Sequence, residues 1–221
     1  MSSILQYNFP TTIRFGTGAV NELGDYLKKN DLAAPLIVTD AIVASLPFFK
    51  KIIQALDNKQ IKATVFHDIH KNPVKSDVYN GTEVFDAEKN DCIIGIGGGA
   101  AIDVARAIVL RVNHREDLFK YDDLIGGDIP TTAGTGSEVG RSAIIADDET
   151  HQKKILFSPK LLAKIIFADP ELTMDLPAPV TAATGMDALT HNMEAYIAKM
   201  SHPLCEGIAL EAISLIHQSL V

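Results

Sequence analysis

The feature that most constrains the fold is the alternation of short apolar runs with segments of helical spacing over the first two-thirds of the chain. Buried strands are predicted at three apolar runs, 34–40, 61–66 and 91–96. Helices are predicted between and after them, at 48–56, 74–90 and 100–112. This alternation predicts a parallel sheet covered on both faces, because parallel neighbours need long crossover connections. Such sheets bind ligands at the carboxyl ends of their strands.

The pattern changes between about residues 170 and 178, where two turn-rich segments contain three prolines. Beyond them, 180–200 and 206–220 have helical spacing and few β-branched residues. We therefore expect a domain boundary here, with a helical domain after it. A single pair of helices leaves apolar faces without partners, so we expect this second domain to be truncated.

Composition excludes several classes of partner. The chain has 221 residues with 28 acidic and 20 basic side chains, and its net charge is −8. This balance argues against a nucleic acid or an anionic membrane, because both need clustered positive charge. No segment reaches about 18 consecutive apolar residues, so no membrane span is expected. Cys92 and Cys205 form no disulfide framework or paired-thiol motif, which favours a cytoplasmic protein.

Three consecutive glycines, Gly97, Gly98 and Gly99, follow the third predicted strand and open a helix. Without side chains they let backbone N–H groups approach a pyrophosphate, and the helix N-terminus adds about half a positive charge. The alternative is a tight turn in which Asp103 only favours the start of the helix. The glycines do not complete the G-x-G-x-x-G pattern, so the generic signal for a dinucleotide is moderate.

Asp40 ends the first predicted strand of the same domain. A carboxylate at this position can accept hydrogen bonds from a ribose diol and would repel a 2′-phosphate, which favours NAD over NADP. The alternative is that Asp40 is a surface cap or turn residue.

The segment 130–138 contains four hydroxyl side chains and two glycines. Hydroxyl donors beside exposed backbone suit a polar cofactor, which makes Thr131, Thr132 and Thr135 candidates for cofactor contacts. The alternative is a polar surface loop.

Asp187 and His191 are four residues apart and share one face if the segment is helical. A carboxylate oxygen and an imidazole nitrogen together suit Fe²⁺ or Zn²⁺. The alternative is an exposed helical ion pair worth about 0.3–0.5 kcal/mol, which the spacing alone favours.

Taken in order, these signals resemble the iron-containing (group III) alcohol dehydrogenase family over nearly the whole chain. The matching segments are 15–18, Asp40, 72–73, 97–103, 130–138, 169–172 and 185–191. The resemblance implies an α/β fold: a Rossmann-like parallel-sheet dinucleotide-binding domain at 1–175, followed by the start of an all-helical metal-binding domain at 176–221.

The family binds its metal through one Asp and three His, and Asp187 and His191 match the first two positions. The resemblance thus implies NAD and Fe²⁺ as cofactors, with Zn²⁺ as the alternative metal. It adds Asn72, Asp103 and, more weakly, Lys154 to the expected cofactor contacts. This chain also departs from the family at two positions. The family usually has Ser where this chain has Ala100, and Lys where it has Arg106. An apolar strand usually precedes Pro130 in the family. Here 126–129, with two glycines, leads directly into Pro130, so we expect either that this strand is missing or that the sequence skips residues at this point.

The function implied is a metal-dependent oxidoreductase that transfers a hydride between a small alcohol, or its aldehyde or ketone, and NAD. The metal would act as a Lewis acid on the substrate oxygen. A homo-oligomer is expected. The first alternative is a non-catalytic NAD-binding fragment or pseudoenzyme that lacks a complete metal site. The second is an assembly module whose helices pair with another chain.

Overall fold

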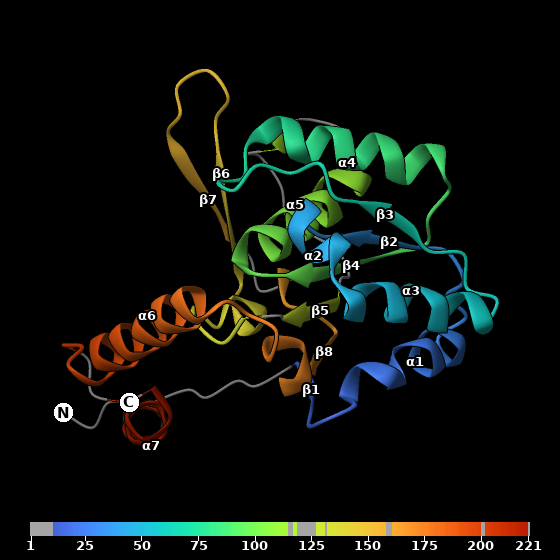
Figure 1. Cartoon of the computed structure of the whole chain (residues 1–221). Coiled ribbons are helices and arrows are strands. Elements are labelled where there is room, and N and C mark those ends of the chain that lie inside the picture. Colours follow the sequence, from blue (N-terminus) through green and yellow to red (C-terminus); the bar gives the residue numbers. More distant parts are fainter. Residues whose placement is uncertain are drawn as a thin grey trace. The chain divides into compact units, whose positions relative to one another are not determined.

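A computed structural model describes residues 11–114, 117–118, 127–130, 132–157, 161–199 and 202–220 of the chain (Figure 1). Its strands are β1 (Thr12–Phe15), β2 (Pro35–Val38), β3 (Thr64–Phe66), β4 (Cys92–Gly97), β5 (Gly127–Pro130), β6 (Ser142–Ala146), β7 (Lys153–Phe157) and β8 (Ile165–Ala168). Its α-helices are α1 (Leu23–Lys29), α2 (Ala41–Ser45), α3 (Pro47–Asn58), α4 (Lys75–Ala87), α5 (Gly99–Asn113), α6 (Ala178–Tyr196) and α7 (Pro203–Leu220). Short 3₁₀ helices are η1 (Ala19–Glu22), η3 (Ser137–Val139) and η5 (Pro170–Thr173).

The described residues group into two compact units. The α/β unit comprises the described residues within 11–131 and 137–172. The helical unit comprises 132–136 and the described residues from 173 onward. Residues 132–136 of the threonine-rich segment, which we call the threonine-rich loop, therefore group with α6 and α7 and not with the strands that flank them in the sequence.

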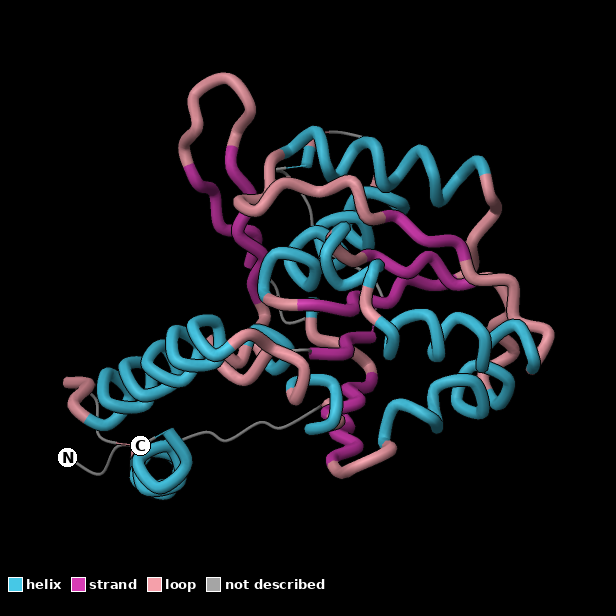
Figure 2. The backbone as a smooth tube through the Cα atoms, viewed as in Figure 1, coloured by secondary structure: helices cyan, strands magenta, loops and turns pink. Residues whose placement is uncertain are grey.

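The α/β unit is built on a sheet whose order, in the described residues, is β1-β8-β5-β4-β2-β3. Every neighbouring pair in this sheet is parallel. Helices lie on both faces of the sheet (Figure 2). The expected Rossmann-like parallel sheet is thus confirmed, and the three strands predicted from apolar runs correspond to β2, β3 and β4.

The expectation of a missing strand before Pro130 was wrong. Gly127–Pro130 forms β5, which pairs with β4 at four positions from Ile94↔Gly127 to Gly97↔Pro130. Among the described residues, it pairs with β8 at Asp128↔Ile166. Parallel pairing needs only backbone donors and acceptors, so a strand can form here without the apolar run that makes β2 and β4 recognisable. The strand is present but short.

Two apolar clusters lie on opposite faces of the sheet. On one face, buried residues of α4 and α5 pack with β2, β4 and the β6–β7 hairpin around Val104 and Ile108. On the other, α1 and α3 pack with β2, β4 and β8 around Leu27 and Phe167. Strand β2, which lies between β4 and β3, is buried along its whole length. Both clusters hold the strand ends in fixed register, which positions the loops at the carboxyl edge.

The helical unit contains α6 and α7, which pack on each other. Gly185 of α6 allows this close contact, since a Cβ placed there would lie 2.7 Å from a methyl group of Leu220. Many apolar side chains of the pair are exposed, including Met186, Met193 and Ile208. None of the helices in the described part of the chain is long and apolar enough to cross a bilayer.

We expect Gly81→Ala to destabilise the α/β unit. Gly81 is buried in α4, and an added Cβ would meet Ile108 of α5 and lie 3.0 Å from the ring of Phe66. Overpacking of this kind typically costs about 1–3 kcal/mol, which outweighs the gain of about 1 kcal/mol from alanine's helix propensity. Urea unfolding followed by circular dichroism measures the difference.

The matched control is Gly24→Ala in α1 of the same unit, where the new methyl group meets chiefly the flexible side chain of Lys59. This side chain can move at the surface, so the control should leave the unfolding free energy unchanged or raise it. Equal effects of the two substitutions would show that α4 and α5 do not pack as described.

Candidate functional site

The carboxyl ends of β2 and β4 form a topological switch point. β4 lies beside β2, and the chain leaves β2 toward β3 on one side and β4 toward β5 on the other. Connections that diverge in this way open a crevice beyond the carboxyl ends of the two strands, which is where open parallel sheets bind ligands. Asp40 follows β2 and the three glycines follow β4, so the fold brings both predicted elements to this crevice.

The glycine loop is shaped for a close approach of backbone to a ligand. Gly97 has φ 154°, a conformation that side chains rarely adopt, and a Cβ there would lie 2.8 Å from the Cβ of Ala101. Gly98 caps α5 without a side-chain hydrogen bond, and the first turn of α5 has no acidic residue. The first N–H groups of this helix therefore point outward with their partial positive charge, as an anion site requires.

Asp40 serves as a helix cap and also faces the glycine loop. Its Oδ1 accepts hydrogen bonds from the N–H groups of Ile42 and Val43, both at 2.9 Å. Its Oδ2 lies 3.7 Å from a Cβ built on Gly97 and accepts none of the hydrogen bonds found among the described residues. Asp40 therefore does cap α2, as the alternative reading of the sequence proposed, but through Oδ1 alone. Its Oδ2 is directed at the glycine loop.

Asp103 connects α5 to the β6–β7 hairpin. Its Oδ2 accepts a hydrogen bond of 3.2 Å from the N–H of Ile144. Burial raises the pKa of Asp103 from its usual 3.8 to about 6, against the opposing effects of the Ile144 N–H and the charge of Arg106. The carboxyl group thus has a structural partner in addition to any contact with a cofactor.

Arg106 has a scaffold role that the sequence did not reveal. It is buried in α5, and its guanidinium donates to the carbonyl oxygens of Ser142 at 3.1 Å and Glu138 at 2.9 Å. The planar fork reaches two backbone acceptors at once, which a lysine ammonium would do less well. Together with Asp103, it fixes the segment that follows the threonine-rich loop onto the glycine-loop helix.

Asn72 is exposed in the loop between β3 and α4, and this loop is organised by the buried carboxylate of Asp77. Asp77 accepts from His70 Nδ1 at 2.7 Å, from His70 N at 3.2 Å and from Val74 N at 3.0 Å. The hydrogen bond to Asp77, and then its charge, raise the pKa of His70. His70 is therefore an exposed histidine that closes the loop carrying Asn72, a role the sequence analysis did not foresee.

The remaining predicted cofactor contacts are spread over both units. Lys154 is exposed on β7 of the hairpin. Thr131 lies outside the described residues. In the helical unit, Thr132 is half-buried and Thr135 is exposed.

Asp187 and His191 lie on one face of α6, as predicted. Asp187 Oδ1 is 3.5 Å from His191 Nε2, and both side chains are about half exposed. Two ligands bound at about 2.0–2.2 Å with tetrahedral geometry would be about 3.4 Å apart, so this separation fits one shared cation. The same separation fits the ion pair considered as the alternative. The described residues hold no group of three or more ligating side chains.

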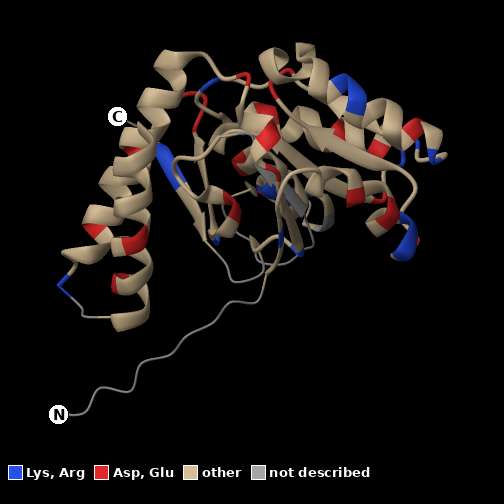
Figure 3. Cartoon of the chain, turned by 60° about the horizontal axis from the view of Figure 1, so that its bottom comes forward, with Lys and Arg blue, Asp and Glu red and all other residues tan. Residues whose placement is uncertain are grey.

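Two features of the surroundings favour a cation between Asp187 and His191. Gly134 of the threonine-rich loop lies against it, since a Cβ there would be 3.2 Å from Asp187 Oδ2. In addition, α6 and α7 carry acidic side chains but neither Lys nor Arg within their spans (Figure 3). An uncompensated acidic field raises the local concentration of cations.

The chain is similar to known proteins over nearly its whole length. The family model for iron-containing alcohol dehydrogenase matches residues 10–170. The model for the C-terminal part of the Fe-containing alcohol dehydrogenase family matches residues 181–221. Alcohol dehydrogenase 4 of Saccharomyces cerevisiae is 33% identical over 229 aligned positions, which cover 100% of this chain and 60% of that protein.

Solved structures are also similar to this chain. A 1,3-propanediol oxidoreductase superposes with a TM-score of 0.94 at 33% identity, covering 99% of this chain and 59% of that one. Sulfoacetaldehyde reductase from Bifidobacterium kashiwanohense in complex with NAD⁺ gives a TM-score of 0.93 at 28% identity, covering 99% of this chain and 60% of that one. The chain therefore spans about 60% of the length of these relatives.

Asp103 should make stability depend on pH. Because its pKa is about 6 in the folded state and about 3.8 when unfolded, the folded protein binds more protons between these values. The stabilising contribution is complete below about pH 3.8 and is lost as the pH rises through 6, by up to about 3 kcal/mol. Urea unfolding at a series of pH values measures this loss.

Asp103→Asn retains an acceptor for Ile144 N but cannot ionise, so we expect it to flatten the fall in stability between pH 4 and 6. Asp147→Asn is the control, because Asp147 lies on the same hairpin with a pKa lowered chiefly by its hydrogen bonds to Thr150. An unchanged slope in Asp103→Asn would contradict the assignment.

Proposed function

This chain belongs to the iron-containing alcohol dehydrogenase family, and we propose that it takes part in hydride transfer between a small alcohol, or its aldehyde or ketone, and NAD. The observation that carries the proposal is the meeting of Asp40 Oδ2 and the Gly97 loop at the switch point. An anion-binding helix terminus and a free carboxylate oxygen on adjacent strands suit the pyrophosphate and the ribose of one dinucleotide.

The proposed boundary between the two domains is the one expected from the sequence, between residues 175 and 176. We assign NAD binding to residues 1–175 and the beginning of the metal-binding helical domain to 176–221, although 132–136 and the residues from 173 onward group with the helical unit. The proposed NAD contacts are Asp40, Asn72, Gly97, Gly98, Gly99, Asp103, Thr131, Thr132, Thr135 and Lys154. The NAD⁺ complex of the related sulfoacetaldehyde reductase supports this choice of cofactor.

Asp187 and His191 are the proposed metal ligands, with Fe²⁺ as the metal and Zn²⁺ as the alternative. When bound, the metal supplies Lewis acidity to the substrate oxygen and the nicotinamide carries the hydride. The chain's own residues hold and orient these groups: the glycine loop binds phosphate, Asp40 selects the ribose, and Asp77 with His70 fixes the Asn72 loop.

A second candidate function is an NAD-binding protein without a catalytic metal. It is favoured by one observation, which is that Asp187 and His191 are joined by no third ligating side chain among the described residues. Catalytic metals usually have three or more protein ligands. Metal binding therefore separates the two candidates.

Further parts of the proposal concern assembly and location. A homo-oligomer is supported by β1, an edge strand in the described sheet whose Ile13 and Phe15 are exposed, because exposed apolar edges invite pairing. A cytoplasmic location is supported by the free cysteines Cys92 and Cys205. The proposed partner is a small-molecule alcohol or carbonyl compound, and we propose neither a nucleic acid nor a membrane.

Asp40→Ser tests the cofactor choice through binding alone. Serine keeps a side-chain oxygen to cap α2 but removes the negative charge that repels a 2′-phosphate. We expect calorimetry to show NAD affinity falling by about tenfold and the preference for NAD over NADP shrinking by at least as much. Asp57→Ser, on the exposed surface of α3, is the control for the charge change. An unaltered NAD-to-NADP ratio would remove Asp40 from the ribose site.

Asp187→Asn and His191→Ala test the metal and the reaction together. The protein is loaded anaerobically with Fe²⁺, its metal content is measured by mass spectrometry, and NAD reduction is followed with a panel of small alcohols. The unaltered protein should hold about one metal per chain and reduce NAD, while each variant should lose both properties. His217→Ala on α7 is the control and should change neither. An unaltered protein that binds NAD but retains no metal would favour the second candidate function.

A further inference from the structure

The Asn72 loop, which is residues 67–74 between β3 and α4, lies at the same edge of the sheet as Asp40 and the glycine loop. It follows the carboxyl end of β3, and β3 is parallel to β2. The N–H of Thr39, next to Asp40, donates to the carbonyl oxygen of Phe66, the last residue before the loop. The loop is therefore placed to act on the proposed dinucleotide site.

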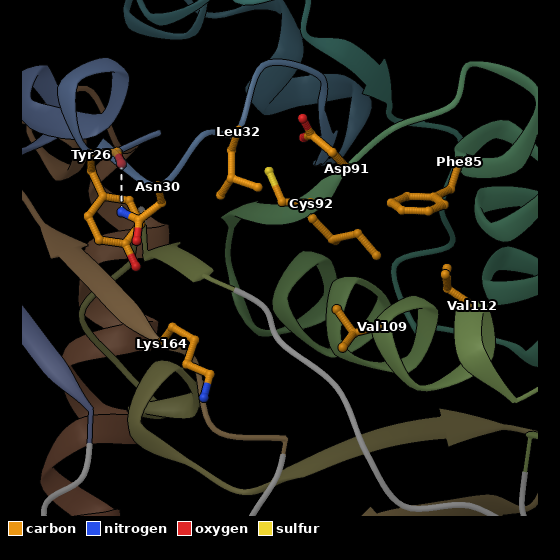
Figure 4. Close-up of a pocket in the computed structure, with 10 residues that line it drawn as sticks. Tyr26, Asn30, Leu32, Phe85, Asp91, Cys92, Val109, Val112 and Lys164 are labelled. Carbon is orange, nitrogen blue, oxygen red and sulfur yellow. Dashed lines mark hydrogen bonds between the residues drawn. The ribbon is translucent and has the colours of Figure 1, made fainter. Parts of the chain in front are cut away.

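Figure 4 shows a pocket at the opposite edge of the sheet. Its lining includes Cys92, which begins β4, and Lys164, which precedes β8, so the pocket lies at the amino ends of strands. None of the described residues that line it belongs to the Asn72 loop. The loop and this pocket are thus separate features of the α/β unit.

The Asn72 loop supplies hydrogen-bond donors to the buried carboxylate of Asp77, in the first turn of α4. Asp77 Oδ2 accepts from the backbone N–H groups of Val74 at 3.0 Å and His70 at 3.2 Å. Asp77 Oδ1 accepts from His70 Nδ1 at 2.7 Å. Asp77 is 2% exposed and the His70 side chain 68%, so the imidazole is the partner that exchanges protons with water. Removing a donor from a buried carboxylate is costly, so the order of the loop depends on His70.

The α4 end of the loop is held by the β6–β7 hairpin and not by His70. The N–H of Ala146 donates to the carbonyl oxygen of Pro73 at 2.8 Å. Asp148, in the turn of the hairpin, accepts from Ser76 N at 3.0 Å and from Ser76 Oγ at 2.6 Å. His70 is therefore the side chain that fixes the part of the loop between β3 and Asn72.

The charges around His70 all favour its protonated form. The hydrogen bond to Asp77, and then the charge of Asp77, raise the pKa of His70, against a small opposing effect of burial. Asp68 of the loop and Asp148 of the hairpin act in the same direction. Lys75 of α4 is paired with a carboxylate at 2.7 Å. The imidazole thus lies among acidic groups from the loop, the helix and the hairpin.

The sign of the pH dependence follows from this direction. The pKa of His70 is raised above its usual value of 6.5 in the folded protein. The stabilisation that the charged imidazole gives to the loop is therefore complete below pH 6.5 and is lost as the pH rises through the raised pKa.

We propose that His70 is a positioning residue for Asn72: its positive charge on Asp77 holds the loop in the conformation that binds NAD, so NAD binds more tightly when His70 is protonated. The inference rests on the proposed contact of Asn72 with NAD. Affinity scales with the fraction of molecules whose loop is in the binding conformation. A neutral imidazole keeps a weaker hydrogen bond to Asp77, and water screens the charge of an exposed group. We therefore expect a difference in NAD affinity of about threefold between the two states.

The loop is tested first, in the protein without NAD. NMR follows the imidazole of His70 and the amides of His70 and Val74 from about pH 6 to about pH 9. We expect all three to titrate together, with a pKa above 6.5, because both amides donate to the carboxylate that the imidazole contacts. A Val74 amide that does not follow the imidazole would overturn the inference.

Calorimetry then measures NAD affinity over the same pH range. His70→Asn keeps a neutral N–H donor for Asp77, so it should bind NAD about threefold more weakly than the unaltered protein at the low end and equally at the high end. His70→Lys keeps a positive charge throughout and should bind about threefold more tightly than the unaltered protein at the high end. His67→Asn, at the other histidine of the loop, which is also exposed, is the matched control and should follow the unaltered protein. Asp103 also titrates near pH 6, but it is present in every variant, so the differences report on residue 70 alone.

The outcomes separate this inference from the proposed function. NAD binding in which unaltered protein and His70→Asn differ by the same factor at every pH would show a structural role only and would overturn the inference. So would a His70→Lys protein that loses affinity with rising pH as the unaltered protein does. Absence of NAD binding in every protein at every pH would overturn the proposed function, and this inference with it.

Discussion

The close approach of β4 to the start of α5 is the constraint on which the α/β unit depends. Gly97 can adopt φ 154° and leave room for Ala101 only because it lacks a side chain. The helix therefore begins directly at the end of the strand. Its N-terminus lies at the switch point beside Asp40, and its buried face forms one of the two apolar clusters. From the same helix, Asp103 and Arg106 fix the hairpin that follows the threonine-rich loop.

The two units carry opposite electrostatic preferences. In the α/β unit, backbone N–H groups at the glycine loop favour an anion. In the helical unit, α6 and α7 have acidic side chains without Lys or Arg, and Asp187 with His191 fits a cation. These preferences suit the proposed dinucleotide in the α/β unit and the proposed divalent metal in the helical unit. The threonine-rich loop belongs to the helical unit through Gly134, although strands flank it in the sequence.

Much of the fold and of the candidate site could be predicted from the sequence, because these features are set by residues close together in the chain. β2 and β4 are apolar runs with a glycine or carboxylate at the end, and Asp187 and His191 share a face because the helical period is local. β5 could not be predicted, since Gly127 and Asp128 give no apolar signal and the strand forms by backbone pairing with β4. The roles of Arg106 and Asp77 depend on carbonyl and N–H groups brought near by folding.

We propose that the glycine loop and the first turn of α5 bind the pyrophosphate of NAD. Amide resonances from ¹⁵N-labelled protein, followed during a titration with NAD, test it most directly. We expect the amides of Gly98, Gly99 and Ala100 to shift most, together with those of Ile42 and Val43, which donate hydrogen bonds to Asp40. Saturable NAD binding that leaves these amides unmoved while shifting others would contradict it.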